Sequence, residues 1–209
     1  MVQQSKLLRY SMIVVDVETT GLNPRKNSIV SIGAVSFENP QEQFYGDCRP
    51  WIGAAVNDQA LSINGFSKEY LKNNKKSHNK LILEFAEWMD RQIDNQIIGG
   101  HNPFFDTGFL TYSYNKCNIK PTFGHRIVDL HSICYAKMIR DMESQNSIYT
   151  NKLHLTSNVI FRYVGLQEEP NPHNGLMGAK MEAEALSRLI LHKNLLEEFK
   201  KFDIPHYIR

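Results

Sequence analysis

Apolar residues in the first hundred positions follow the period of strands and then the period of a helix face. Residues 12–17 (MIVVDV) and 29–37 (IVSIGAVSF) are rich in β-branched side chains and flank the turn-forming sequence TTGLNP. They predict an antiparallel hairpin, and residues 43–50 predict a third strand of the same meander. From Asn79 to Ile93 the apolar spacing fits one helix face, and the short apolar run 97–102 predicts a buried strand after it.

Strand and helix patterns alternate in the second half of the chain. The remaining predicted elements, in chain order, are a helix over 103–116, a strand over 125–130, a helix over 131–140, an exposed polar loop over 141–153 and helices at about 155–164 and 178–200. A meander of three strands followed by this alternation predicts an α/β or α+β domain with a mixed sheet flanked by helices.

Length and composition predict one domain. The chain has 209 residues, of which 42% are hydrophobic and 22% are charged, and this is enough for one sizeable core without a disordered tract. We therefore expect a single domain over 1–209 with its core at about 12–190. The 24 basic and 22 acidic residues give a formal charge of +2, which neither requires nor excludes a nucleic-acid partner.

Cysteine usage and the start of the chain predict a cytoplasmic protein. Cys48, Cys117 and Cys134 are widely spaced and form no CxxC pair, which favours reduced thiols over a disulfide frame or a zinc site. The first twelve residues lack the apolar region of a secretion signal, and no apolar run is long enough to span a membrane. We expect no membrane partner.

Two carboxylates lie at the end of the first predicted strand. Because side chains alternate along a strand, Asp16 and Glu18 share one face. Two like charges near an apolar core are costly unless something compensates them, and a hard divalent cation such as Mg²⁺ or Mn²⁺ is the natural compensation. The alternative is a solvated loop start in which Glu18 is exposed.

Two further polar residues stand in settings that suit a site. Asp106 lies among aromatic residues in the first turns of a predicted helix, and His173 lies in a loop rich in Pro and Asn just before a helix. Each has a simpler interpretation, because acids are favoured near helix N-termini and histidines are common on surfaces.

Three short motifs together resemble the DEDDh exonucleases, the family of bacterial proofreading subunits, ribonuclease T and oligoribonuclease. VVDVETTG matches the first family motif closely, HNPFFD matches the second, and HNGLMGA matches the third incompletely. The segment LSINGFS at 61–67 is similar to the family segment that packs beside the terminal base. The resemblance covers about residues 12–190 and implies an RNase H-like fold with a mixed five-stranded sheet flanked by helices.

The resemblance also implies a reaction, which is metal-dependent hydrolysis at the 3′ end of single-stranded DNA or short RNA with release of nucleoside monophosphates. Two Mg²⁺ or Mn²⁺ ions would be held by Asp16, Glu18 and Asp106, while His173 would accept the proton of the attacking water. The residues that would contact the terminal nucleotides are Thr19, Leu22, Phe66 and Phe105. A polymerase or a second copy of the chain is the protein partner that the family suggests.

The third motif departs from the family pattern, in which His is followed five residues later by Asp. That position is Gly178 here, so the resemblance also allows a weakened enzyme or a module that only binds 3′ ends. Glu182 lies one helical turn later and is a candidate replacement ligand, because a longer side chain can reach back over Gly178. The alternative is that Glu182 and Glu184 belong to a solvated helix face.

Overall fold

The first three strands form the meander that the sequence predicts. The computed structural model describes residues 12–92, 97–144 and 155–208. In it β1 (Met12–Thr19) pairs antiparallel with β2 (Ile29–Ser36), which pairs antiparallel with β3 (Gln43–Asp47). On the other side of β1, β4 (Ile97–Gly100) and β5 (Ile127–Asp129) pair in parallel, so the strand order is β3-β2-β1-β4-β5. The predicted mixed five-stranded sheet is confirmed.

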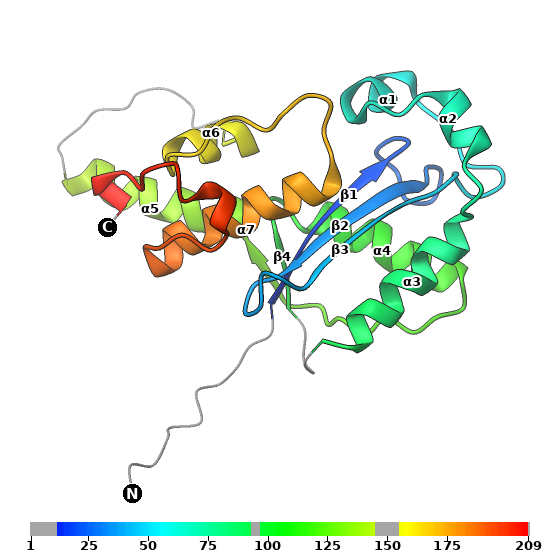
Figure 1. The fold of residues 1–209 in the computed structure, drawn as a ribbon, viewed down its shortest axis with the longest axis horizontal. Helices are drawn as coiled ribbons and strands as arrows, with labels where there is room; N and C mark the ends of the chain where they lie inside the picture. The colour runs from blue at the N-terminus through cyan, green and yellow to red at the C-terminus, as the bar shows by residue number, and fades with distance from the viewer. Residues whose placement is uncertain (1–11, 93–96, 145–154, 209) are drawn as a thin grey trace, which may run out of the picture.

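Helices cover both faces of this sheet (Figure 1). One face is covered by α3 (His78–Asp90) and α4 (Phe104–Lys116), and the other is covered by α5 (Leu130–Ser144), α6 (Ser157–Tyr163) and α7 (Gly175–Leu191). Two short helices, α1 (Asp58–Asn64) and α2 (Lys68–Asn73), lie beyond the end of β1, and two 3₁₀ turns, η1 (Glu197–Phe199) and η2 (His206–Ile208), close the chain.

The two sides of β1 serve two cores. Ile13, Val15 and Val17 pack with α3 and α4, whereas Met12 and Val14 pack with the residues of α5, α6 and α7. This two-residue period continues to the end of the strand. The side chains at positions 16 and 18 therefore belong to the α7 face.

Two glycines let α7 begin directly on the sheet. A Cβ atom at Gly33 of β2 would lie 2.0 Å from the carbonyl carbon of Gly175, and a Cβ at Gly175 would lie 2.8 Å from the carbonyl oxygen of Asp16. Asn174 caps the helix by accepting hydrogen bonds from the N–H groups of Leu176 and Met177. The first turn of α7 is therefore held against β1 at Asp16.

The last predicted helix differs from the observed one. Instead of running over 178–200, α7 begins at Gly175 and ends at Leu191, where His192 adopts a left-handed backbone with φ of 55°. After this turn the chain folds back on α7, and the Glu184 carboxylate accepts the N–H groups of Leu195 and Leu196. The buried Glu184 side chain thus stabilises the turn at which α7 ends.

Other element boundaries shift more modestly. The helix predicted to reach Ile93 ends at Asp90, and residues 93–96 lie outside the described residues. The helix predicted over 131–140 extends through Ser144 into the predicted loop, of which residues 145–153 are not described. No helix in the described part of the chain has the length and apolar character needed to cross a bilayer.

Candidate active site

Three carboxylates from β1 and α4 meet at the end of the central strand. Asp16 and Glu18 stand on the α7 face of β1, and Asp106 reaches them from the first turn of α4. Asp106 accepts a hydrogen bond of 2.9 Å from the N–H of Val17 and is 5% exposed, while Glu18 is 9% exposed. Burial excludes both the solvated loop start for Glu18 and the exposed helix terminus for Asp106.

His173 is brought to this end of the sheet by the loop before α7. Its N–H donates to the carbonyl of Ile63 in α1 at 3.0 Å, and the adjacent Pro172 packs against the position of Gly65, where a Cβ would lie 2.5 Å from the proline ring. Nδ1 of His173 lies 3.5 Å from Oε2 of Glu169, and the histidine side chain keeps 31% exposure. The imidazole therefore has one side fixed by an acid and another side open to solvent.

The two acids of α7 are not on a solvated face, so that interpretation is wrong for both. Glu182 is 7% exposed and accepts a hydrogen bond from the backbone N–H of His101. Glu184 is fully buried and forms an ion pair with Arg188 at 2.8 Å. The physical reason is that the sheet covers one side of α7 while the returning C-terminal segment covers the other.

Burial and mutual repulsion raise the pKa values of the acids in this region. Burial raises the pKa of Asp16 well above its usual value, and the neighbouring Glu182 carboxylate raises it further. Burial and the charge of Glu169 raise the pKa of Glu18 to about 7. Burial also raises the pKa of Asp106 to about 7 and increases the pKa values of Glu169 and Glu182. This concentration of negative charge favours a cation.

The donor set fits a hard divalent cation. All of these side chains present carboxylate oxygens, the ligands that Mg²⁺ and Mn²⁺ prefer, and Oε1 of Glu169 is buried without a hydrogen-bond partner among the described residues. In the described ranges, however, no three His, Cys, Asp or Glu side chains are already arranged around a common point as a cation site.

Gly178 lies at the centre of this region and brings no acid. A Cβ at this position would be 2.0 Å from Oδ2 of Asp16 and 3.3 Å from Oε1 of Glu169. The two carboxylates thus approach the space above the glycine from the strand and from the preceding loop.

A cavity of about 270 Å³ opens beside Glu18. Three of the four residues predicted to contact a nucleotide line it, namely Thr19, Leu22 and Phe105. Phe66 does not line the cavity and instead packs near Leu61 and Leu71. The remaining lining residues are Val17, Gly21, Asn57, Gln59, Ala60, Ile63 and Asn64.

Segment 61–67 was expected beside the terminal base, but the helix α1 and the lining residues Ile63 and Asn64 were not predicted from the sequence. Asn64 of α1 donates from Nδ2 to the carbonyl of Thr19 at 3.1 Å, which ties the helix to the end of β1. The Thr19 hydroxyl donates to the carbonyl of Gly21 at 2.7 Å. The segment resembling the family's base-packing region thus forms one wall of the cavity, through Ile63 and Asn64 rather than through Phe66.

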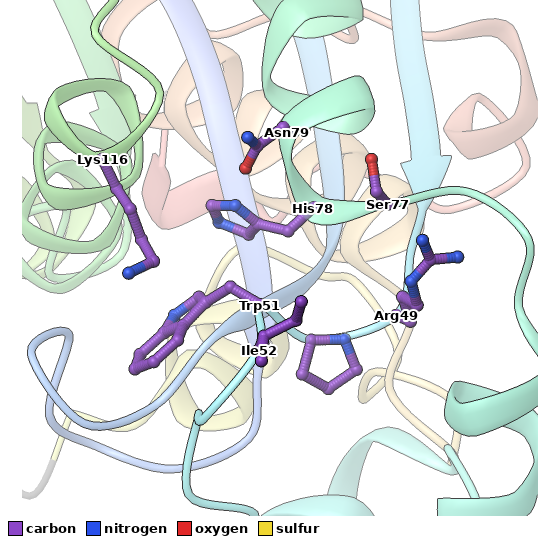
Figure 2. Close-up of a pocket in the computed structure, with 8 residues that line it drawn as sticks. Arg49, Trp51, Ile52, Ser77, His78, Asn79 and Lys116 are labelled. Atoms are coloured by element: carbon purple, nitrogen blue, oxygen red, sulfur yellow. The ribbon is translucent and has the colours of Figure 1, made fainter.

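A second pocket, of about 350 Å³, lies where the start of α3 meets the end of α4 (Figure 2). Its lining includes Arg49, Trp51, His78 and Lys116, and Nζ of Lys116 lies 4.2 Å from the centre of the Trp51 ring. It shares no lining residue with the cavity beside Glu18. This basic and aromatic pocket is therefore distinct from the carboxylate region.

Comparison with known proteins identifies relatives that match most of the chain. A family model described as an exonuclease matches residues 13–186. The 3′-5′ DNA exonuclease Cap18 of Escherichia coli is 29% identical over 195 residues, which cover 91% of this chain and 95% of Cap18. DNA polymerase III subunit epsilon of Buchnera aphidicola is 25% identical over 197 residues, with 90% of this chain and 74% of that protein covered.

Solved nuclease structures share the fold. The nuclease domain of 3′hExo, a DEDDh family member bound to rAMP, matches with a TM-score of 0.66 at 16% identity over 94% of this chain and 98% of that one. Exonuclease I of E. coli in complex with a dA16 oligonucleotide gives a TM-score of 0.65 at 12% identity, and the match covers 86% of this chain but 41% of Exonuclease I. The sheet is thus RNase H-like, as expected, and the family match over most of the chain shows that this protein belongs to the exonuclease family.

Proposed function

We propose that the protein is a cation-dependent 3′ to 5′ exonuclease that hydrolyses the terminal phosphodiester of single-stranded DNA or short RNA and releases nucleoside monophosphates. The observation that carries this proposal is the convergence of Asp16, Glu18 and Asp106 at the end of β1, beside a cavity with apolar walls. A structural acid cluster without a ligand would cost stability, because buried like charges repel one another.

The three carboxylates would hold Mg²⁺ or Mn²⁺. Divalent cations bound there would polarise the scissile phosphate, activate a water molecule and stabilise charge on the leaving oxygen. The hydrogen bond from the Val17 N–H fixes Oδ1 of Asp106, which leaves its other oxygen for a ligand. The raised pKa values of Glu18 and Asp106 mean that the cation would also favour the charged form of each acid at neutral pH.

His173 would accept the proton of the attacking water. Its Nδ1 faces Glu169 at 3.5 Å, which leaves Nε2 as the ring nitrogen available to the reacting water. Its backbone bond to Ile63 places it against a helix that lines the cavity. The histidine and the terminal nucleotide would therefore both lie against α1.

The cavity beside Glu18 would hold the terminal nucleotide. Leu22 is 85% exposed at its rim, and Phe105 lines it from α4, so both offer apolar faces on which a base can stack without sequence reading. Thr19 would meet the 3′-hydroxyl. An unpaired end enters such a cavity more easily than a base pair, which supports a single-stranded substrate.

The names of relatives support nucleic-acid 3′ ends as the substrate class. They include a DNA exonuclease, ribonuclease T of Pectobacterium atrosepticum and a structure in complex with a dA16 oligonucleotide. A DNA polymerase III subunit is also among them, so a polymerase is the protein partner to test first and self-association is the alternative. The choice between DNA and RNA is an outcome of the substrate test.

The test uses one 20-nucleotide single strand carrying a fluorophore at either its 5′ or its 3′ end, in Mn²⁺. With the 5′ label we expect a descending ladder, and with the 3′ label we expect immediate release of a labelled mononucleotide. Release of labelled 5′ mononucleotide first, or internal cuts alone, would overturn the proposed polarity. Matched RNA and DNA strands in competition identify the preferred sugar.

One observation favours a second candidate, a module that grips 3′ ends and cleaves slowly. Gly178 stands where the resemblance expects an acid, and removal of a carboxylate costs transition-state stabilisation. This candidate predicts tight binding of single strands in Mn²⁺ with almost no shortening by wild type. A gain of several orders of magnitude in Gly178→Asp would support it.

A further inference from the structure

Glu169 is a buried acid in the loop before α7 that has no place in the three sequence motifs. It is 8% exposed, and its Oε1 atom finds no hydrogen-bond partner within the described part of the chain. An unpaired buried carboxylate oxygen is costly. Its presence here calls for a ligand that the protein itself does not supply.

The position of Glu169 is fixed on both sides. Its N–H donates to Oδ1 of Asn158 in α6 at 2.9 Å, and its Oε2 atom lies 3.5 Å from Nδ1 of His173. These contacts direct the other oxygen, Oε1, toward Gly178, where it lies 3.3 Å from the site of the missing Cβ. Oδ2 of Asp16 lies 2.0 Å from the same point.

We propose that Glu169 is a cation ligand of the active site and supplies from the loop the carboxylate that position 178 lacks. The inference rests on the proposed function, because it assigns a ligand to the same cation. A glycine at 178 is what makes the arrangement possible, since any side chain there would occupy the space between Asp16 and Glu169.

Glu182 is the competing candidate for this role. Its Oε2 atom lies 3.1 Å from the position of a Cβ at Gly100, and its carboxylate accepts the N–H of His101. Glu182 therefore already has a partner at the turn between β4 and α4. Oε1 of Glu169 has no hydrogen-bond partner among the described residues, and it lies beside the same Gly178 position as Oδ2 of Asp16, so Glu169 is the better replacement.

A second role for Glu169, orientation of His173, needs only Oε2 and leaves the orphaned Oε1 unexplained. The two roles differ in their effect on the cation. A residue that only orients His173 changes the pH profile of the reaction but leaves cation affinity intact, whereas a ligand changes the affinity itself.

The experiment is calorimetric titration of the full chain with Mn²⁺, without nucleic acid, for wild type, Glu169→Gln and the control Glu168→Gln. Glu168 is the adjacent residue, and its side chain is 52% exposed and paired with Arg162. We expect Glu169→Gln to weaken Mn²⁺ binding by roughly ten- to hundredfold or more, since even residues that contact a metal ligand have effects of this size. Glu168→Gln should bind like wild type. Equal affinity of wild type and Glu169→Gln overturns the inference.

Two further measurements test whether Glu169→Gln acts through the cation or through a loss of structure. Glutamine has the shape of glutamate, so the melting temperature of Glu169→Gln in EDTA should equal or exceed that of wild type. In Glu169→Gln with Gly178→Asp, a carboxylate returns at the helix position, and Mn²⁺ affinity should rise above that of Glu169→Gln alone. If the folded double variant binds Mn²⁺ no better than Glu169→Gln, this contradicts the inference that the carboxylate of Glu169 replaces the one missing at position 178.

The outcomes separate this inference from the proposed function. If wild type binds Mn²⁺ and shortens strands while Glu169→Gln binds equally well, only the ligand assignment to Glu169 fails. If wild type neither binds Mn²⁺ nor shortens strands, the proposed function fails and the ligand assignment fails with it.

Discussion

The Oδ2 atom of Asp16 lies in the space that a side chain at Gly178 would occupy, 2.0 Å from the position of its Cβ. The Asp16 side chain on β1 can therefore adopt this position only because residue 178 on α7 has no side chain. A change at position 178 must displace the carboxylate of Asp16, and the geometry of the site and the stability of the fold are coupled through this pair.

Gly178→Ala is expected to destabilise the protein. Replacement of glycine by alanine inside a helix normally stabilises by about 0.5–1 kcal/mol, but here the new methyl group would meet Asp16. We expect the free energy of unfolding to fall by about 1–3 kcal/mol, the usual cost of overpacking. Urea unfolding followed by circular dichroism in EDTA measures it.

Gly108→Ala is the matched control for this substitution. Gly108 is also in a helix, α4, and a Cβ there would meet no heavy atom within 4 Å. This change should stabilise by the normal helix increment. Equal effects of the two substitutions would contradict the close fit between Gly178 and Asp16.

The stability of the metal-free protein should fall as pH rises. Burial raises the pKa of Glu18 and of Asp106 to about 7, so their contribution to stability is present below the pKa values of the unfolded chain and is lost as pH rises through about 7. One pKa unit corresponds to about 1.4 kcal/mol, which predicts a loss of a few kcal/mol between about pH 5 and pH 8.

Urea unfolding in EDTA across this pH range tests that dependence. The variant Glu18→Gln with Asp106→Asn removes both titrations, and its stability should vary less with pH than that of wild type. The side-chain oxygen of asparagine can still accept the N–H of Val17. If the wild type instead gains stability relative to the variant as pH rises over this range, the predicted direction of the pH dependence is contradicted.

Much of the fold followed from local patterns. The two-residue period of side chains along a strand was sufficient to place Asp16 and Glu18 on one face of β1, and the aromatic setting of Asp106 singled it out as a candidate site residue. The helices α1 and α2 were missed because each is short and buries few residues, Leu61 and Asn64 in one and Leu71 in the other. So few buried positions give no helical period.

Burial of the acids in and before α7 depends on contacts that sequence spacing does not contain. Glu169 follows another acid, Glu168, and precedes a proline in a polar loop, and only the approach of Asn158 and Gly178 shows where its carboxylate points. Glu184 occurs in a stretch with ordinary surface composition, and its burial follows from the return of the C-terminal segment over α7. The burial of both acids therefore depends on contacts between residues that are far apart in the sequence or on different elements.

Arg188→Met should destabilise the fold without altering the site directly. Arg188 is fully buried, pairs with Glu184 and donates to the carbonyls of Val164, Phe199 and Phe202. Its removal leaves Glu184 as a buried unpaired charge, which costs roughly 3–5 kcal/mol. Thermal unfolding measures the effect.

An exposed pair in the same protein provides the control. Arg162 forms an ion pair with Glu168 with side chains 58% and 52% exposed. Arg162→Met should cost no more than about 1 kcal/mol, because solvent screens exposed pairs. A similar loss of stability in both variants would contradict the claim that the buried Arg188–Glu184 pair contributes more than an exposed ion pair.

Substitution of the apolar residues at the cavity should weaken binding of single strands. Leu22→Ala and Phe105→Ala each remove a face on which a terminal base would stack, which is worth about 1–3 kcal/mol per base. We expect KM for a short strand to rise by about tenfold or more, with no preference for sequence. Leu83→Ala, on the exposed side of α3 at 44% exposure, is the control and should leave KM unchanged.

The central claim is that the acids at the end of β1 hold a cation that drives hydrolysis at a 3′ end. The most direct measurement is the rate of labelled mononucleotide release from a 3′-labelled strand as Mn²⁺ is added to EDTA-treated wild type and Asp16→Asn. We predict no release without the cation, a rate that rises and saturates with Mn²⁺ in wild type, and loss of nearly all release in a folded Asp16→Asn. Release that continues in EDTA, or that is equal in Asp16→Asn, would contradict the account.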